Sequence, residues 1–117
     1  MPTSEPALGA GAVVIIPFPY ADRLAEKRRP AVVISNASVA AAGFVWIAMI
    51  TSARNAPMAD DLPIADLARA GLAKPSVVRP LKIACIDGSR VVRRAGDLDP
   101  AAAEHLFDRV RSLIGRA

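Results

Sequence analysis

The chain has 117 residues, of which 53% are apolar and 22% charged, and its formal net charge is +4. These values exclude an intrinsically disordered protein and predict a single domain with a core of its own. Cys85 and His105 are the only cysteine and the only histidine, which excludes a disulfide scaffold and argues against the usual His/Cys metal sites. We therefore predict no metal and no cofactor. The excess of arginine is compatible with a phosphate-rich partner, but a GC-rich coding sequence explains it as well.

The N-terminal residues 1–10 are rich in Pro, Ser and Ala and predict a loose leader before a single domain over residues 11–117. This leader has neither the positive charge nor the apolar core of a secretory signal. Residues 30–53 carry no charge, but polar residues interrupt them near the middle, so two buried strands explain them better than a membrane span. We expect a cytoplasmic protein without a membrane segment.

The first half of the chain predicts three strands. Val13–Ile16, Ala31–Ser35 and Phe44–Thr51 are runs of β-branched and aromatic residues of strand length. Between the first two, Tyr20–Arg29 is polar and charged and predicts a loop. Asn36–Gly43 predicts a turn or a small loop before the third strand.

A polar loop over residues 52–61 follows, and Leu62–Ala65 predicts a short strand. Asp66 is placed to cap a turn of helix that Gly71 would end, which predicts a short helix in the middle of the chain.

Two strand pieces, Val77–Val78 and Leu81–Ile86, are separated by Pro80. The Asp87–Gly88 dipeptide is typical of a tight turn between strands. Val91–Ala95 is therefore predicted to complete a hairpin with the preceding strand.

The last segment has the spacing of a helix with one apolar face. Asp99 is a favourable N-cap, Pro100 a favourable first residue, and Gly115 ends the pattern. Many short strands followed by one amphipathic helix predict a small β-barrel with helical additions. The apolar positions of the helix are Ala103, Leu106, Phe107, Val110, Leu113 and Ile114.

Two side chains within the predicted strands are assigned to the core. Trp46 shares a strand face with Phe44, Ala48 and Ile50, so packing is favoured over base stacking. Cys85 lies in an apolar run and is predicted to be an inert core thiol.

Four segments resemble one family when they are taken in order and at their observed spacing. They are Val13–Tyr20, Lys27–Ser35, Ile50–Ser52 and Lys74–Ala84. Each segment alone is a weak signal, because an apolar strand followed by a basic turn is common. Together they resemble the MazF/PemK toxin family over residues 11–114.

The resemblance implies a mainly β fold, a small SH3-like barrel of the MazF/PemK/CcdB type with a short middle helix and a C-terminal amphipathic helix. It implies the toxin of a type II toxin–antitoxin pair, acting as a homodimer. Such toxins are metal-independent endoribonucleases that cut single-stranded RNA at specific sequences and leave a 2′,3′-cyclic phosphate and a 5′-hydroxyl. The implied partners are this RNA and a cognate antitoxin that is acidic and partly disordered.

Cleaving RNA without a metal requires activation of the 2′-hydroxyl, stabilisation of charge at the phosphate and protonation of the leaving oxygen. Arg29 precedes Pro30, which favours extended backbone, and a guanidinium there can bind a phosphate through two hydrogen bonds. Thr51 ends the third predicted strand, where its hydroxyl can donate to a phosphate oxygen. The resemblance implies that Arg29 and Thr51 are the catalytic pair.

Other residues are predicted to bind the RNA. Lys82 alternates with Leu81 and Ile83, so it points away from the face that these two share and can line a groove. Ser52 is the nearest competitor for the role of the Thr51 hydroxyl. Two aromatic residues flank a proline at a loop entrance, where bases could stack. The predicted RNA-binding residues are Arg28, Ser52, Arg79, Lys82, Phe18 and Tyr20.

Two other functions are open alternatives. One is a CcdB-like toxin that inhibits DNA gyrase without catalysis, and the presence of Arg29 and Thr51 favours the nuclease over it. The other is a degenerate family member that only binds RNA or antitoxin. It is kept because Ala12 stands where the family usually has an acidic residue and residues 21–26 contain less glycine than usual.

Overall fold

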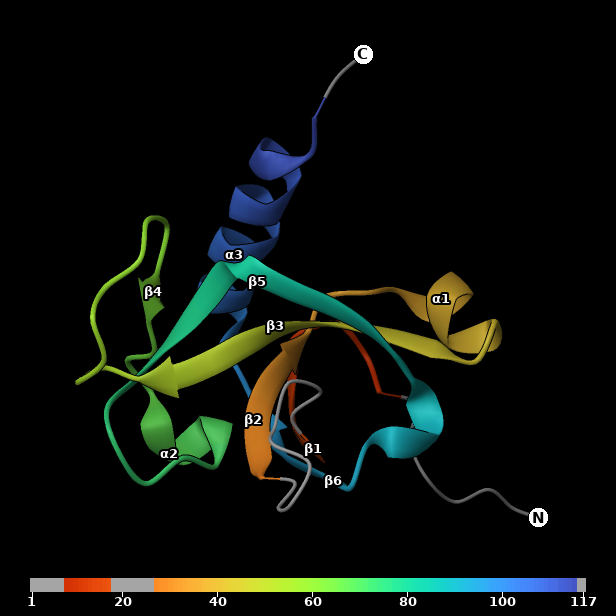
Figure 1. The fold of residues 1–117 in the computed structure, drawn as a ribbon, viewed down its shortest axis with the longest axis horizontal. Coiled ribbons are helices and arrows are strands. Elements are labelled where there is room, and N and C mark those ends of the chain that lie inside the picture. The colour runs from red at the N-terminus through yellow and green to blue at the C-terminus, as the bar shows by residue number, and fades with distance from the viewer. Residues whose placement is uncertain (1–7, 18–26, 116–117) are drawn as a thin grey trace.

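The computed structural model describes residues 8–17 and 27–115 and has a six-stranded antiparallel sheet with short helices. The strand order is β4-β5-β3-β2-β1-β6. Figure 1 shows the long strands β3 and β5 across the front and β2, β1 and β6 turning away behind them, so the sheet curls into a half-barrel. The elements in chain order are β1 (Ala12–Pro17), β2 (Arg28–Val33), α1 (Ala37–Ala41), β3 (Phe44–Ser52), β4 (Leu62–Pro63), α2 (Leu67–Ala70), β5 (Ser76–Asp87), the 3-10 turn η1 (Gly88–Arg90), β6 (Arg93–Asp97) and α3 (Pro100–Leu113).

The central strands are buried on both faces. Val13 packs in one cluster with Leu106 of α3, whereas its neighbour Val14 packs in a second cluster with Ile47. Successive side chains of a strand point to opposite faces, so every side chain of a strand that is covered on both faces is buried and favours an apolar residue. This is why residues 13–16 form an unbroken apolar run. None of the helices within the described ranges is long and apolar enough to cross a membrane.

The two predicted helices are confirmed, together with their caps. The Asp99 side chain accepts a hydrogen bond from the N–H of Ala102 at 2.9 Å at the start of α3. Asp66 does the same for Arg69 at 3.1 Å at the start of α2. Gly71 ends α2 with φ +76°, a left-handed conformation that glycine adopts without strain.

The prediction of an irregular loop over residues 36–43 is wrong, because this segment contains the short helix α1. Asn36 caps it by accepting from the N–H groups of Ser38 and Val39, at 3.0 and 3.4 Å. A helix of five residues without a buried side chain has no apolar periodicity. The Asn36 cap was therefore the one local signal in the sequence.

The two predicted strand pieces around Pro80 form one strand, β5. Its pairing with β3 changes register between Ala48, which lies opposite Ile83, and Met49, which lies opposite Arg79. Pro80 lies within this irregularity. The regular ladder is already interrupted there, so a residue without an N–H is tolerated.

The predicted hairpin between β5 and β6 is also wrong, because β6 pairs with β1. The Asp87 carboxylate accepts hydrogen bonds from both the N–H and the hydroxyl of Ser89, at 2.9 and 2.8 Å. These bonds stabilise the turn η1. The chain therefore leaves β5 instead of folding back along it, and it reaches the free edge of β1.

The side chains of Trp46 and Cys85 are not in the core, contrary to expectation. Trp46 is 46% exposed, and Cys85, its partner in the β3–β5 ladder, is exposed as well. The expectation that Trp46 shares a face with Ala48 and Ile50 is met, and both of these are buried in the cluster that α3 completes. The core on this face includes only the second half of β3. Trp46 therefore lies on the same face as Ala48 and Ile50 but outside the core.

The α2 segment lies against β6 with glycine on both sides of the contact. A Cβ on Gly71 would lie 2.2 Å from the carbonyl oxygen of Ala95, and one on Gly96 would lie 2.2 Å from that of Arg69. No side chain fits at these distances, so both positions require glycine for the approach of two backbones.

Candidate active site

Arg29 and Thr51 lie at the ends of two paired strands. The antiparallel register of β2 and β3 places Ala31 opposite Met49. Continuing that register by two residues along each strand places Arg29 opposite Thr51. Strand pairing thus brings together two residues that are far apart in the sequence.

Both residues line one cavity of about 390 Å³, between β2, β3, β5 and the loop after β3. Three of the lining residues are cationic, of which Arg79 is paired with Asp61 outside the lining, and among the described residues that line the cavity none is acidic. A concave site with this charge favours an anionic ligand. The predicted residues Arg29, Thr51, Arg79 and Lys82 are therefore gathered at one place. The complete lining is Arg29, Met49, Ile50, Thr51, Asn55, Arg79 and Lys82.

Asn55 is the polar lining residue that sequence reasoning missed. Its side-chain Nδ2 donates a hydrogen bond to Thr51 Oγ1 at 2.6 Å. The residue follows Thr51 by four positions in an exposed polar loop, and nothing in a loop of this composition distinguishes it. Its only sequence signal was its closeness to the predicted catalytic strand end.

The Arg79 side chain is partly buried and bound to the loop over residues 53–61. Its Nε and Nη2 donate to the two carboxylate oxygens of Asp61 at 3.1 and 3.2 Å, and Nη2 also donates to the carbonyl oxygen of Ala56 at 2.8 Å. The side chains of Arg79 and Asp61 are each 13% exposed. A fork-shaped contact of this kind is specific in its geometry, so Arg79 fixes the loop onto β5.

Desolvation by partial burial raises the pKa of Asp61, but the hydrogen bonds from Arg79 and from the N–H of Met58 outweigh it. The resulting pKa lies below the ordinary aspartate value. A lowered carboxylate pKa contributes stability that is present at neutral pH and is lost as the pH falls through the folded-state value. The attachment of the loop therefore persists until the solution is strongly acidic.

A second ion pair joins the same loop to the C-terminal helix. Asp60 Oδ1 lies 2.6 Å from Arg109 Nη1 of α3. Asp60 has φ +69°, in the left-handed region that aspartate tolerates better than most residues. The loop is thus attached to β5 through one aspartate and to α3 through the next.

Of the remaining predicted site residues, Arg28 and Ser52 are not part of this cavity lining. Arg28 is exposed and pairs with Pro17 in the β1–β2 ladder. The Ser52 hydroxyl accepts a hydrogen bond from the N–H of Arg54 at 3.1 Å, which gives it a role in the turn after β3. Phe18 and Tyr20 lie outside the described residues.

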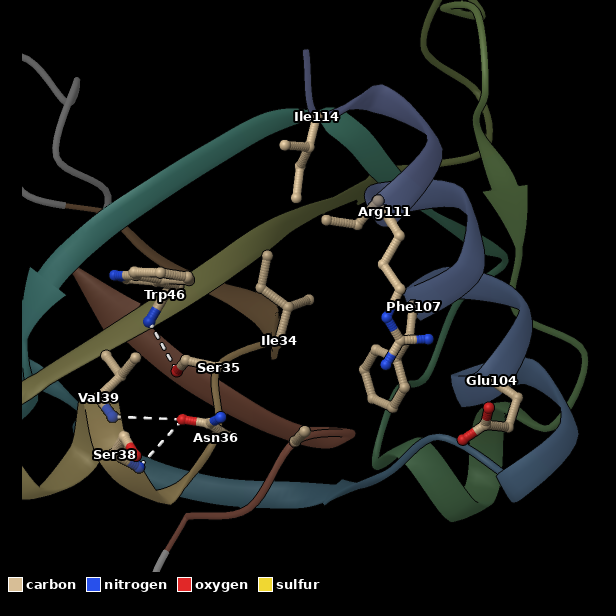
Figure 2. Close-up of a pocket in the computed structure, with 12 residues that line it drawn as sticks. Ile34, Ser35, Asn36, Ser38, Val39, Trp46, Glu104, Phe107, Arg111 and Ile114 are labelled. Atoms are coloured by element: carbon tan, nitrogen blue, oxygen red, sulfur yellow. Dashed lines mark hydrogen bonds between the residues drawn. The ribbon is translucent and has the colours of Figure 1, made fainter. Parts of the chain in front are cut away.

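A larger cavity of about 620 Å³ lies between α1, β3 and α3 (Figure 2). In this view Trp46, Ile34 and Phe107 border the same space, with Ile114 at its upper end. Its lining is mainly apolar. Among the described residues, no three His, Cys, Asp or Glu side chains are grouped as they would be around a metal ion.

The chain matches one known protein family along most of its length. Residues 10–114 match the model of a family described as the PemK-like, MazF-like toxins of type II toxin–antitoxin systems. Comparison with the curated proteins gives no match.

Solved structures share the fold along almost the whole chain. MazF of Deinococcus radiodurans superposes with a TM-score of 0.74 at 23% identity, over 96% of this chain and 100% of that one. A chain of the MazE–MazF complex from the same organism gives 0.71 at 21%, over 97% and 100%. An endoribonuclease from a mycobacterial species, solved with its cognate antitoxin, gives 0.66 at 13%, over 92% and 98%. At these identities the similarity shows the fold.

Proposed function

Because this chain belongs to the PemK-like, MazF-like toxins of type II toxin–antitoxin systems, we propose that it is a sequence-specific, metal-independent endoribonuclease acting on single-stranded RNA in the cytoplasm. The observation that carries the proposal is the cavity that Arg29, Thr51 and Lys82 share. One structural neighbour is itself described as an endoribonuclease.

In the proposed reaction the 2′-oxygen attacks the adjacent phosphorus and the bond to the 5′-oxygen breaks. A water molecule accepts the proton of the 2′-hydroxyl as the new bond forms, and the 5′-oxygen takes up a proton from water as it departs. The Arg29 guanidinium stabilises the added negative charge of the pentavalent state through two hydrogen bonds, and it stays protonated throughout. The Thr51 hydroxyl donates to a second phosphate oxygen, and Lys82 adds positive charge at the rim.

The first prediction is cleavage of a long RNA in the presence of excess EDTA, with a 2′,3′-cyclic phosphate and a 5′-hydroxyl at the new ends. No step of the proposed reaction uses a metal ion. Sequencing and end-group analysis of the products measure both points. Activity that disappears in EDTA and returns with Mg²⁺ would contradict the proposal, and RNA binding without cleavage would support the degenerate alternative.

We also propose that an acidic, partly disordered antitoxin occupies the same cationic surface as the RNA. The surface attracts either polyanion, so the two partners should exclude one another. The second prediction is that an uncleavable RNA and the antitoxin compete, and that Lys82→Ala weakens RNA binding and lowers its salt slope by about 0.7. Lys74→Ala, which removes an exposed lysine outside the cavity, is the matched control. A ternary complex with unchanged RNA affinity would show that the two sites are separate.

The homodimer is a further part of the proposal, and exposed apolar side chains support it. Phe44 and Trp46 of β3 are 47% and 46% exposed, and Leu81 and Ile83 of β5 are nearly as open. A monomer seldom leaves so many large apolar side chains on neighbouring strands uncovered. A second copy covering them would remove this area from water.

A further inference from the structure

The Thr51 hydroxyl already has one hydrogen-bond partner within the cavity. Asn55 Nδ2 donates to Thr51 Oγ1 at 2.6 Å, and both residues line the space that Arg29 enters from β2. A hydroxyl has one proton to donate and two positions at which it can accept. Since Asn55 occupies an acceptor position, the Thr51 proton is turned away from the amide.

We propose that Asn55 is a positioning residue, whose amide orients the Thr51 hydroxyl as a donor to a phosphate oxygen of the bound RNA. This inference rests on the proposed ribonuclease function. Accepting a hydrogen bond also polarises a hydroxyl and makes it a stronger donor. Asn55 thus contributes to the reaction through the Thr51 hydroxyl.

The chain holds Asn55 on both sides. Its backbone N–H donates to the carbonyl oxygen of Ser52 at 3.1 Å, which closes the turn after β3. The carbonyl oxygen of the next residue, Ala56, accepts from Arg79 at 2.8 Å. The ion pair of Arg79 with Asp61 fixes this contact in turn. The amide is therefore presented to Thr51 by a loop segment that is fixed at two points.

The decisive variant is Asn55→Asp. The amide of Asn55 donates a hydrogen bond to Thr51 Oγ1, whereas a carboxylate at this position can only accept one from the Thr51 hydroxyl. The hydroxyl is then turned away from the phosphate, and kcat should fall about a hundredfold at pH 7. Asn55→Ala only removes the amide donor, so its kcat should fall about tenfold. Asn55 is exposed and no core contact depends on it, so both variants should fold as the wild type does.

The pH dependence separates a positioning role from a structural one. A protonated carboxyl donates as the amide does, so the Asn55→Asp variant should regain activity as the pH falls. The cations around the cavity favour the charged carboxylate, so the pKa of the new carboxyl lies at or below the ordinary aspartate value of about 3.9, and kcat relative to wild type should rise about threefold or more between pH 7 and pH 4. Arg29, Arg79 and Lys82 face the new carboxyl from β2 and β5, and Arg54, Asp60 and Asp61 lie on its own loop, with Arg109 of α3 on Asp60. These groups are present in both proteins, so a pH-dependent ratio reports the new carboxyl.

Two controls complete the experiment. Ala53→Asp places a carboxylate at an exposed position in the same loop, away from the cavity lining, and its ratio to wild type should not depend on pH. Asn55→Ala should give a constant ratio as well. The inference is wrong if Asn55→Asp retains wild-type kcat at pH 7, or if its ratio is constant while its kcat is low. If the wild type itself does not cleave RNA, the proposed function fails, and that result is distinct from either of these.

Discussion

Replacing Arg29 by alanine is expected to lower kcat for RNA cleavage about 10²–10³-fold, the usual effect of removing one positioned group that stabilises transition-state charge. Arg29 lies at the start of β2, half-buried at the cavity and opposite Ile16 in the ladder. It belongs to neither apolar cluster, so the fold should remain intact. Single-turnover cleavage of a defined oligonucleotide measures the effect on the chemical step.

Arg29→Lys tests whether charge alone is sufficient. An ammonium group cannot form the two parallel hydrogen bonds of a guanidinium, so this variant should also be severely impaired. Arg93→Ala is the matched control, since it removes an exposed arginine of β6 that lies outside the cavity lining and is not a predicted RNA-binding residue. More than about a tenth of wild-type activity in Arg29→Ala would contradict the catalytic assignment.

Gly71→Ala is expected to lower the free energy of unfolding by about 3 kcal/mol or more, because two costs coincide at this position. Its φ of +76° is unfavourable for any residue with a Cβ. The added Cβ would also lie 2.2 Å from the carbonyl oxygen of Ala95, so α2 would have to move off β6. Urea unfolding followed by tryptophan fluorescence gives the change, with Trp46 as the only tryptophan.

Two further glycines separate these costs. Gly43 has φ +95°, and apart from its chain neighbours no atom of the described residues lies within 4 Å of the point that a Cβ would occupy there, so Gly43→Ala should carry the backbone cost alone, about 1–2 kcal/mol. Gly96 has its φ outside the left-handed region, and its Cβ would meet Arg69, so Gly96→Ala carries only the steric cost. Equal losses in Gly71→Ala and Gly43→Ala would show that the contact of α2 with β6 adds nothing to the stability.

Sequence signals within a few residues were sufficient to predict the strands and helices whose formation depends on local residues. The apolar runs gave β1 and β3, and the Asp66 and Asp99 caps marked the starts of α2 and α3. The run Ala31–Ser35 gave only part of β2, which begins at Arg28, in the predicted loop, and ends at Val33. The partner of β6 could not be predicted in this way. A turn dipeptide such as Asp87–Gly88 reports that the chain changes direction, whereas β6 pairs with β1 at the other end of the sequence.

In the candidate site, too, the residues that belong to a sequence motif could be predicted, and those that depend on tertiary contacts could not. Arg29 and Thr51 were identified through family resemblance, and the register of β2 with β3 accounts for their meeting. Asn55 could not be found, because its significance depends on a loop whose path is fixed by an ion pair between residues 18 positions apart, Asp61 and Arg79. Arg79 lines the cavity together with Arg29 and Thr51, but its attachment to that loop is a tertiary contact without a sequence signal.

The strand order leaves β6 at one edge of the sheet and the short β4 at the other, and the two edges differ in how easily another strand could pair with them. The edge strand β6 is short and carries Arg93, Arg94 and Asp97, and charges of this kind discourage pairing with another chain. At the other edge, β4 pairs only with Val77 and Val78 of the twelve-residue strand β5. Within the described ranges, no strand lies beside the rest of β5 on that side. Charges therefore oppose strand addition less along Ile83–Ile86 of β5, which lie between Lys82 and Asp87, than along β6.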